Sequence, residues 1–341
     1  MIYYCGLIFL IFIFRAASSF FKDCERKAFF LPTALTVILF QGLRSFSVGT
    51  DLSVYIPAYE EIGKEVALSF NMKYLNFETG YVLLNKLLYL AGFGERAFLI
   101  TVTIIIQAPI FYVMYKYSAR PLLSVTSYFA FGNFIVTFSG LRQGIAMSLC
   151  FAAYVFIKNK KLVRFILITL IACFFHKSAV LCFVLYPLYY VKIKKTALPF
   201  VLFGVALCFL FKEQIVRLLS YAYYGKGAET EPNGSYTMFF MYLVLYVVSI
   251  FISGSEEKSG IENILLLLVC IYSLSSIHET IARTAFPLSL YLSLLIPEIV
   301  AGINVKTEKD GLMLNILCNA LCVACFLFFV GNFGTLPFGF L

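Results

Sequence analysis

The apolar run Phe165-Ile-Leu-Ile-Thr-Leu-Ile-Ala-Cys-Phe-Phe175 is followed by His176-Lys177-Ser178-Ala179, and a second apolar stretch then continues to Val191. Such runs predict helices in a lipid bilayer, where the backbone must form its own hydrogen bonds. An ionisable group within a membrane segment costs roughly a few kcal/mol, which makes it a candidate for function by default. His176 is one of only 2 histidines in the chain, and the search for a site starts from it.

The composition extends this interpretation to all 341 residues. The chain is 61% hydrophobic and 13% charged, with a mean hydropathy of +0.90, whereas soluble domains contain about 25% charged residues. Apolar runs of roughly 15 to 21 residues favour spanning helices over the alternating strands of an outer-membrane barrel. We therefore predict an all-α polytopic membrane protein that forms a single transmembrane domain over residues 1–341.

The apolar segments predict about twelve transmembrane helices (11–13). They lie at 2–14, 28–43, 97–115, 121–141, 143–157, 165–175, 177–191, 196–211, 237–253, 263–277, 284–303 and 312–330. The segment 80–93 is apolar but short, with Lys86 in its middle, and predicts a re-entrant or interfacial helix. Two longer outer loops are predicted at 44–79 and 212–236.

Loops rich in Lys and Arg indicate which ends of the spans face the cytoplasm. Most of these residues fall in short loops at 15–27, 116–120, 158–164, 192–195, 254–262 and 304–311. The net charge of +9 therefore reflects cytoplasmic loops, and no nucleic-acid partner is predicted. The outer face then carries Arg44, Asp51, Glu78, Arg142, His176, His278 and Arg283.

Two arginines that begin or precede predicted spans are candidates for anion binding. A guanidinium binds two phosphate oxygens at once, which lysine does less well. Arg142, followed by Gln143, could instead extend along the apolar surface to the interface, and Arg283 could form an ordinary helix ion pair with Glu279. The positions after Gln143 are small enough for close helix packing; they are Gly144, Ala146 and Ser148.

The loop after residues 28–43 also carries candidates. Arg44 could meet an anionic head group, while Asp51 and Tyr55 shape a site beside it. The alternative is a capped loop, in which Asp51 begins a short helix at 52–62.

Glu78 and His176 are the candidates for acid–base chemistry. Glu78, just before Tyr81, could simply favour the N-terminus of a short helix, and His176 could hydrogen-bond to a neighbouring helix. A neutral imidazole accepts a proton near pH 7. Its position at a helix break, beside Lys177, favours such a role.

Missing motifs narrow the chemistry. All ten cysteines except Cys24 lie in apolar runs without metal-ligand spacing, and no outer Asp-x-Asp pair, glycine-rich nucleotide loop or Gly-x-Ser-x-Gly motif is present. We predict no metal and no cofactor. An enzyme that faces away from ATP needs a lipid-carried, activated donor, and arginines can stabilise a departing polyprenyl pyrophosphate.

Together these stretches resemble the EpsG family of polysaccharide polymerases, which is related to the Wzy O-antigen polymerases. The matching pieces are Gly42-Leu43-Arg44…Gly49-Thr50-Asp51…Tyr55, Phe77-Glu78-Thr79-Gly80-Tyr81, Leu141-Arg142-Gln143-Gly144-Ile145-Ala146 and Ala172-Cys173-Phe174-Phe175-His176-Lys177-Ser178-Ala179, with Ile281-Ala282-Arg283 as a late arginine. Four pieces in this order make the resemblance specific.

The resemblance implies a bacterial inner-membrane glycosyltransferase with a GT-C-like fold and an active site that faces the periplasm or exterior. Such enzymes polymerise repeat units carried on undecaprenyl pyrophosphate into O-antigen, capsule or exopolysaccharide, without a metal, and a chain-length regulator is a possible partner.

The resemblance also assigns roles to residues. Arg142 and Arg283 bind the donor pyrophosphate with help from Arg44, and His176 is the general base, with Asp51 or Glu78 in reserve. The predicted substrate-binding residues are Arg44, Asp51, Tyr55, Glu78, Tyr81, Gln143, Lys177 and His278.

Three other classes stay open. An O-antigen ligase would pass glycan to a lipid A core. A lipid-linked oligosaccharide flippase would spread charges through the bilayer depth and could show an internal repeat. A membrane acyltransferase would need its histidine on the cytoplasmic side, opposite to the orientation predicted for His176.

Overall fold

A computed structural model describes residues 1–65, 77–224, 236–277, 279–331 and 334–340. These residues form helices and no strand; their one β-type contact is an isolated bridge between Arg44 and Phe340. The helices are α1 (Ile2–Ser18), α2 (Glu25–Gly42), α3 (Leu52–Lys64), α4 (Thr79–Leu90), α5 (Glu95–Tyr117), α6 (Pro121–Ala130), α7 (Asn133–Ser139), α8 (Leu141–Ala152), α9 (Tyr154–Lys158), α10 (Leu162–Phe175), α11 (Leu185–Tyr189), α12 (Leu198–Leu210), α13 (Lys212–Tyr224), α14 (Thr237–Phe251), α15 (Glu256–Leu274), α16 (Glu279–Ser289), α17 (Leu292–Gly302) and α18 (Glu308–Phe329). Short 3-10 helices cover Lys22–Cys24, Lys177–Val184 and Lys195–Ala197.

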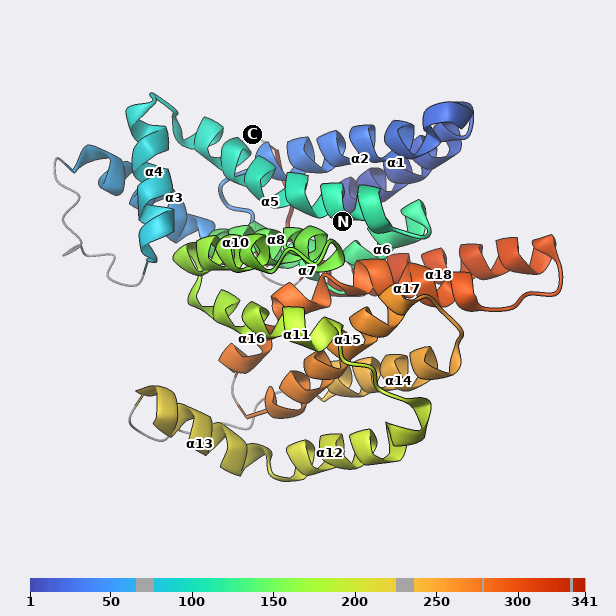
Figure 1. Cartoon of the computed structure of the whole chain (residues 1–341). Helices are drawn as coiled ribbons and strands as arrows, with labels where there is room; N and C mark the ends of the chain where they lie inside the picture. Colours follow the sequence, from blue (N-terminus) through green and yellow to red (C-terminus); the bar gives the residue numbers. More distant parts are fainter. Residues whose placement is uncertain (66–76, 225–235, 278, 332–333, 341) are drawn as a thin grey trace.

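Most of the long helices lie side by side and run across the view of Figure 1, whereas α4 stands across them at one end of the molecule. Helix α8 packs between α5 and α10. Gly144, one of the small residues predicted to allow close packing, does so, because a Cβ there would lie 2.9 Å from the Cδ1 atom of Ile106 in α5.

Among the described residues, three helices are long and apolar enough to cross a membrane, and up to seven spans result if each bent pair of helices counts as one. These are fewer than the predicted twelve. Three of the predicted spans are the shorter apolar helices Leu162–Phe175, Lys177–Tyr189 and Thr237–Phe251, and a helix of about 14 residues extends only ~21 Å of a ~30 Å hydrocarbon core. The count of twelve stays a prediction.

Two predicted spans are broken helices. The segment 121–141 divides into α6 and α7 with a bend of 53°, and 284–303 divides into α16 and α17 with a bend of 52°. Gly132 lies at the first break with φ of +72°, a conformation that costs other residues energy. The break lets α7 end beside the start of α8.

The predicted cytoplasmic loop 254–262 is wrong, because α15 begins at Glu256 and includes most of it. Lys258 forms a buried ion pair with Glu262 one turn later and donates to the carbonyls of Ser249 and Ile252 at the end of α14. These contacts satisfy helix-end carbonyls that have no intrahelical partner. Charges that suggested a solvated loop therefore hold two helices together.

The predicted outer loops also contain helices, α3 within 44–79 and α13 within 212–236. The helix predicted near 80–93 is α4, which is not among the helices long enough to span. Lys86 of α4 donates to the carbonyls of Ile62 and Gly63 at the end of α3. Its charge in the middle of an apolar segment thus joins these two helices.

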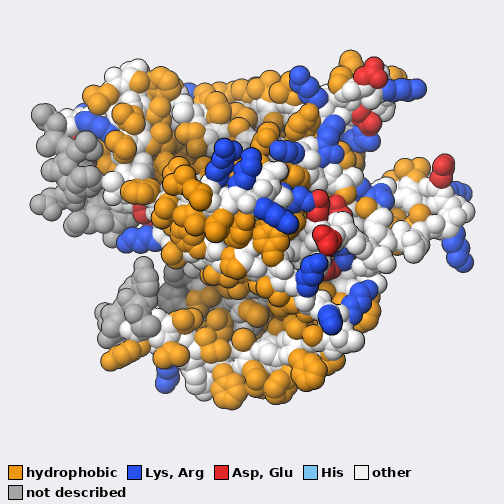
Figure 2. Space-filling model, in the orientation of Figure 1, with side chains coloured by type: hydrophobic (Ala, Val, Ile, Leu, Met, Phe, Trp, Pro, Cys, Tyr) orange, Lys and Arg blue, Asp and Glu red, His pale blue; other side chains and the backbone are white. Residues whose placement is uncertain are grey.

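The face in Figure 2 is largely hydrophobic, as expected of a surface in contact with lipid. Most of the Lys and Arg side chains visible there gather in the centre and right of the view.

Candidate functional site

The candidate site lies where α8 begins and α10 ends. Helices α8 and α9 together form one candidate span, Leu141–Lys158, of 18 residues, which extends about 27 Å at 1.5 Å per residue. The chain then returns through α10, packed against α8. Arg142 in the first turn of α8 and His176 directly after α10 thus share one end, and the basic loop 158–164 lies at the other.

The carboxylate of Glu78 connects these two residues. Its Oε2 atom lies 2.5 Å from Nη1 of Arg142, and its Oε1 atom lies 3.0 Å from Nδ1 of His176. The backbone N–H of Lys177 also donates to Oε1, at 3.3 Å. The side chain of Glu78 is only 9% exposed, so three segments distant in sequence meet at one shielded carboxylate.

Aromatic side chains hold the guanidinium of Arg142 in place. Its Nε atom donates to the hydroxyl of Tyr55 at 3.2 Å, and its Cζ atom lies 4.5 Å from the ring centroid of Phe77. The ring of Tyr81 packs edge-on against both Tyr55 and Phe77. Tyr55 and Tyr81 are buried, and Tyr81 packs behind the two rings that contact Arg142.

The surroundings of Glu78 keep its carboxyl ionised. Burial raises the pKa of this group, but the hydrogen bond from His176 and the positive charges of Arg142 and His176 outweigh burial and lower the pKa to about 2. An ionised carboxylate only accepts hydrogen bonds. When the imidazole of His176 is neutral, the hydrogen shared with Glu78 therefore sits on Nδ1, and Nε2 carries the lone pair.

Gly80 allows the approach that brings Glu78 to His176. A Cβ at Gly80 would lie 2.7 Å from the carbonyl oxygen of Phe174 in α10, a distance that real Cβ contacts do not show. The start of α4 can therefore lie against the last turn of α10 only without a side chain at this position.

We expect Gly80→Ala to separate Glu78 from His176 and to reduce activity ~10²-fold, since a displacement of about 1 Å at a site has this effect. The turnover of the purified variant measures this effect. Gly204→Ala in α12 is the matched control, because a Cβ there meets nothing within 4 Å. Equal activity of the two variants would contradict the role given to Gly80.

Some of the other residues predicted for the site also lie near the start of α8. The Nε2 atom of Gln143 donates to the backbone carbonyl of Arg283 at 2.6 Å, which brings the start of α16 to that of α8. The side chains of Arg283 and Lys177 are exposed. His278 lies outside the described residues.

Asp51 precedes α3 and is exposed. The helix predicted at 52–62 is confirmed as Leu52–Lys64, but the side chain of Asp51 makes no capping bond there. Its Oδ1 atom accepts from the hydroxyl of Thr50 at 3.0 Å.

Arg44 does not fit the predicted role as an anion ligand. Its side chain is 0% exposed, and it donates to the backbone carbonyls of Val48, Gln41 and Phe138 at 3.1, 2.5 and 2.8 Å. A guanidinium enclosed by carbonyls is bound to the fold and not presented to a substrate. The sequence showed a polar residue after an apolar run, which either role would produce.

Two features of the site were underestimated from the sequence. Glu78 was only a reserve base and a substrate contact, yet it joins Arg142 to His176. Phe77 had no assigned role, yet its ring packs against the Arg142 guanidinium. The sequence signal was an aromatic residue, Phe77, next to the carboxylate of Glu78 in a polar loop. The role of this pair depends on which helices approach the loop.

Comparisons with known proteins give one family. The model of the EpsG family matches residues 27–340, nearly the whole chain. No curated protein and no solved structure matches the chain. Within the described ranges, no group of three His, Cys, Asp or Glu side chains is arranged to hold a metal ion.

Proposed function

Since the chain belongs to the EpsG family of Wzy-like polysaccharide polymerases, we propose that it joins lipid-linked oligosaccharide repeat units into a surface polysaccharide. The donor is a glycan on undecaprenyl pyrophosphate, and the acceptor is a hydroxyl at the non-reducing end of the next lipid-linked unit. The observation that carries this proposal is the contact of one carboxylate, Glu78, with both Arg142 and His176.

In this proposal His176 acts as the general base. Its Nε2 atom takes the proton of the acceptor hydroxyl as the oxygen forms a bond to the anomeric carbon of the donor. Glu78 fixes the ring through Nδ1 and stabilises the imidazolium that results, as a carboxylate does in other base–carboxylate pairs. The reaction needs no oxidant and no further group.

The bond that breaks joins the anomeric carbon to the pyrophosphate. Negative charge develops on the departing polyprenyl pyrophosphate, and in this proposal Arg142 and the exposed Arg283 stabilise it. Glu78 and the aromatic side chains hold Arg142 before the substrate arrives, and this preorganisation avoids the cost of reorienting the guanidinium during the reaction.

The charge distribution supports an outward-facing site in the inner membrane. The site lies about 27 Å along α8 and α9 from the basic loop 158–164, and short basic loops face the cytoplasm. A site at the opposite end reaches repeat units that have crossed to the outer leaflet.

The experiment is a reconstitution. The purified protein in proteoliposomes receives purified undecaprenyl-pyrophosphate-linked repeat units and a lipid A core, with and without EDTA, and gel analysis reports chain length. We expect a ladder of polymers in both cases. Transfer to a lipid A core without a ladder would identify a ligase, and absence of any transfer, with movement of the units across the bilayer, would identify a transporter.

We expect His176→Ala to lower the turnover rate ~10²-fold or more, since a positioned general base contributes about 10² to 10⁴. Donor binding should change little, because the base acts on the acceptor. Turnover and donor affinity measured on the same preparation separate these effects. Undiminished polymerisation by His176→Ala would exclude histidine as the base.

A further inference from the structure

The end of α7 determines where α8 starts. Helix α7 ends at Ser139, Gly140 follows, and Arg142 is the second residue of α8. Carbonyls in the last turn of a helix lack partners within that helix. Whatever binds these carbonyls at the end of α7 therefore fixes the first turn of α8.

Two side chains from the end of α2 and the loop after it make these contacts. Gln41 donates from Nε2 to the carbonyl of Thr137 at 2.8 Å, and Arg44 donates from Nη2 to the carbonyl of Phe138 at 2.8 Å. The Cζ atom of Arg44 also lies 4.8 Å from the ring centroid of Phe138. Its remaining bonds, to Gln41 and Val48, close the loop around the guanidinium.

The backbone of the same loop lies directly on α7. Gly49 has φ of +109°, and a Cβ there would lie 2.6 Å from the carbonyl oxygen of Phe138. The next residue, Thr50, donates its N–H to Oγ of Ser139 at 3.0 Å. Only glycine combines this conformation with this contact.

The C-terminal segment 334–340 holds the loop from its other side. Ser45 and Gly49 donate their N–H groups to the carbonyls of Gly339 and Gly334, at 2.8 and 2.9 Å. The hydroxyl of Tyr4 donates to the carbonyl of Thr335 at 3.0 Å, so α1 also contacts the segment.

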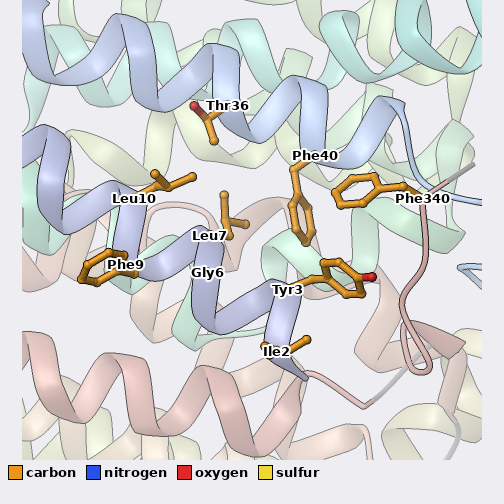
Figure 3. A pocket seen from close by; sticks show the side chains of 9 residues that line it. All are labelled: Ile2, Tyr3, Gly6, Leu7, Phe9, Leu10, Thr36, Phe40 and Phe340. Atoms are coloured by element: carbon orange, nitrogen blue, oxygen red, sulfur yellow. The ribbon is translucent and has the colours of Figure 1, made fainter.

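Aromatic packing anchors the same segment. Phe338 stacks on Phe40 of α2, with ring centroids 4.4 Å apart. Figure 3 shows Phe340 beside Phe40 and Tyr3, at one end of an apolar groove of about 580 Å³ between α1 and α2. The segment is thus fixed to the first two helices.

We infer that loop 43–50, held by Arg44 and by the C-terminal segment 334–340, positions Arg142 for binding the donor pyrophosphate. Arg44, Gly49 and the C-terminal segment are positioning elements that do not touch the substrate. The inference rests on the proposed function, because it assigns a consequence to the placement of Arg142. It also assigns a structural role to segment 334–340, in which the sequence shows no motif.

The test combines Arg44→Lys with Arg142→Lys. A lysine cannot donate to three separate carbonyls in the fixed geometry of a guanidinium, so we expect Arg44→Lys to raise the KM for the lipid-linked donor ~10-fold or more, without a change in the pH profile of kcat. If Arg44 acts through Arg142, the two effects are not additive, and Arg44→Lys changes little in the Arg142→Lys background. Independent, additive effects would overturn the inference.

A glycine pair keeps the test valid if Arg44→Lys does not fold. We expect Gly49→Ala to raise the donor KM as Arg44→Lys does. Gly92→Ala is the control, because Gly92 has φ of +82° but its added Cβ would meet nothing within 4 Å. Equal KM values for the two variants would overturn the inference, since backbone strain alone would then be responsible.

The two proposals fail in different ways. If Arg142→Ala leaves donor binding unchanged, the proposed function of Arg142 is wrong. If Arg142→Ala abolishes donor binding while Gly49→Ala and Arg44→Lys leave the donor KM unchanged, only the positioning role is wrong.

Discussion

Replacement of Glu78 by glutamine lowers the rate of polymerisation by ~10³-fold or more. An amide of the same shape removes the negative charge that faces Arg142, and its single oxygen cannot accept from both Arg142 and Nδ1 of His176. Loss of the fixed tautomer alone costs up to about 10⁴ in catalytic pairs of this kind. Breaking a shielded ion pair also leaves Arg142 with an uncompensated charge. One substitution thus affects both proposed roles of the site.

Initial rates with purified lipid-linked repeat units measure this effect. Glu61→Gln is the matched control. Glu61 is an exposed carboxylate on α3, so this substitution removes the same charge from the same predicted outer loop, 44–79. A Glu78→Gln variant that retains more than about a tenth of the activity would show that the carboxylate is not part of the mechanism.

Acid stability provides an independent measurement on the same variant. The folded-state pKa of Glu78, about 2, lies below the ordinary value of 4.5. The stabilisation that ionised Glu78 contributes is therefore complete above about pH 4.5 and is lost as the pH falls toward 2. Between pH 7 and pH 3 the unfolding midpoint of the wild type should fall more than that of Glu78→Gln. Equal decreases would mean that Glu78 is not held by its neighbours.

Replacement of Arg142 by lysine weakens donor binding ~10²-fold. The guanidinium contacts Glu78, the Tyr55 hydroxyl and the ring of Phe77 at once, and an ammonium group cannot keep this planar geometry while it binds two phosphate oxygens. The same charge is retained, so the loss measures geometry. Arg142→Ala should lose more, because the charge is removed as well.

Equilibrium binding of a non-hydrolysable lipid pyrophosphate to the detergent-solubilised protein measures the affinity. Arg217→Lys in α13 serves as the control, since Arg217 is an exposed arginine outside the site. Donor affinity within about twofold of the wild type in Arg142→Lys would mean that any positive charge suffices, and the bidentate role would be excluded.

Several conclusions of the sequence analysis depend on local information and are confirmed. An apolar composition with recurring long runs predicts helices that pack against one another or lipid, and the described residues are helical. The short segment with Lys86 is a separate helix that is too short to span. The quoted pieces of sequence indicated the EpsG family, and the family model matches residues 27–340.

The number of spans was harder to predict from the sequence, because hydropathy does not reveal where a helix bends. Gly132 and the break after Ser289 divide apolar runs that look continuous. Lys258 and Glu262 looked like part of a solvated loop, but a partner one turn away and two exposed carbonyls allow their burial. A charged residue in a sequence is expected to be exposed to solvent. The free-energy cost of burying it depends on the partners that helix packing brings to it.

The sequence by itself determined that this chain forms membrane helices, which family it resembles, and that Arg142 and His176 deserve attention, because these features depend on residue type and order along one segment. Only the tertiary structure decided that Glu78 joins them and that Arg44 is enclosed by carbonyls. Such assignments depend on contacts between residues 64 to 98 positions apart, and side chains so distant in sequence are brought together by the way the helices pack.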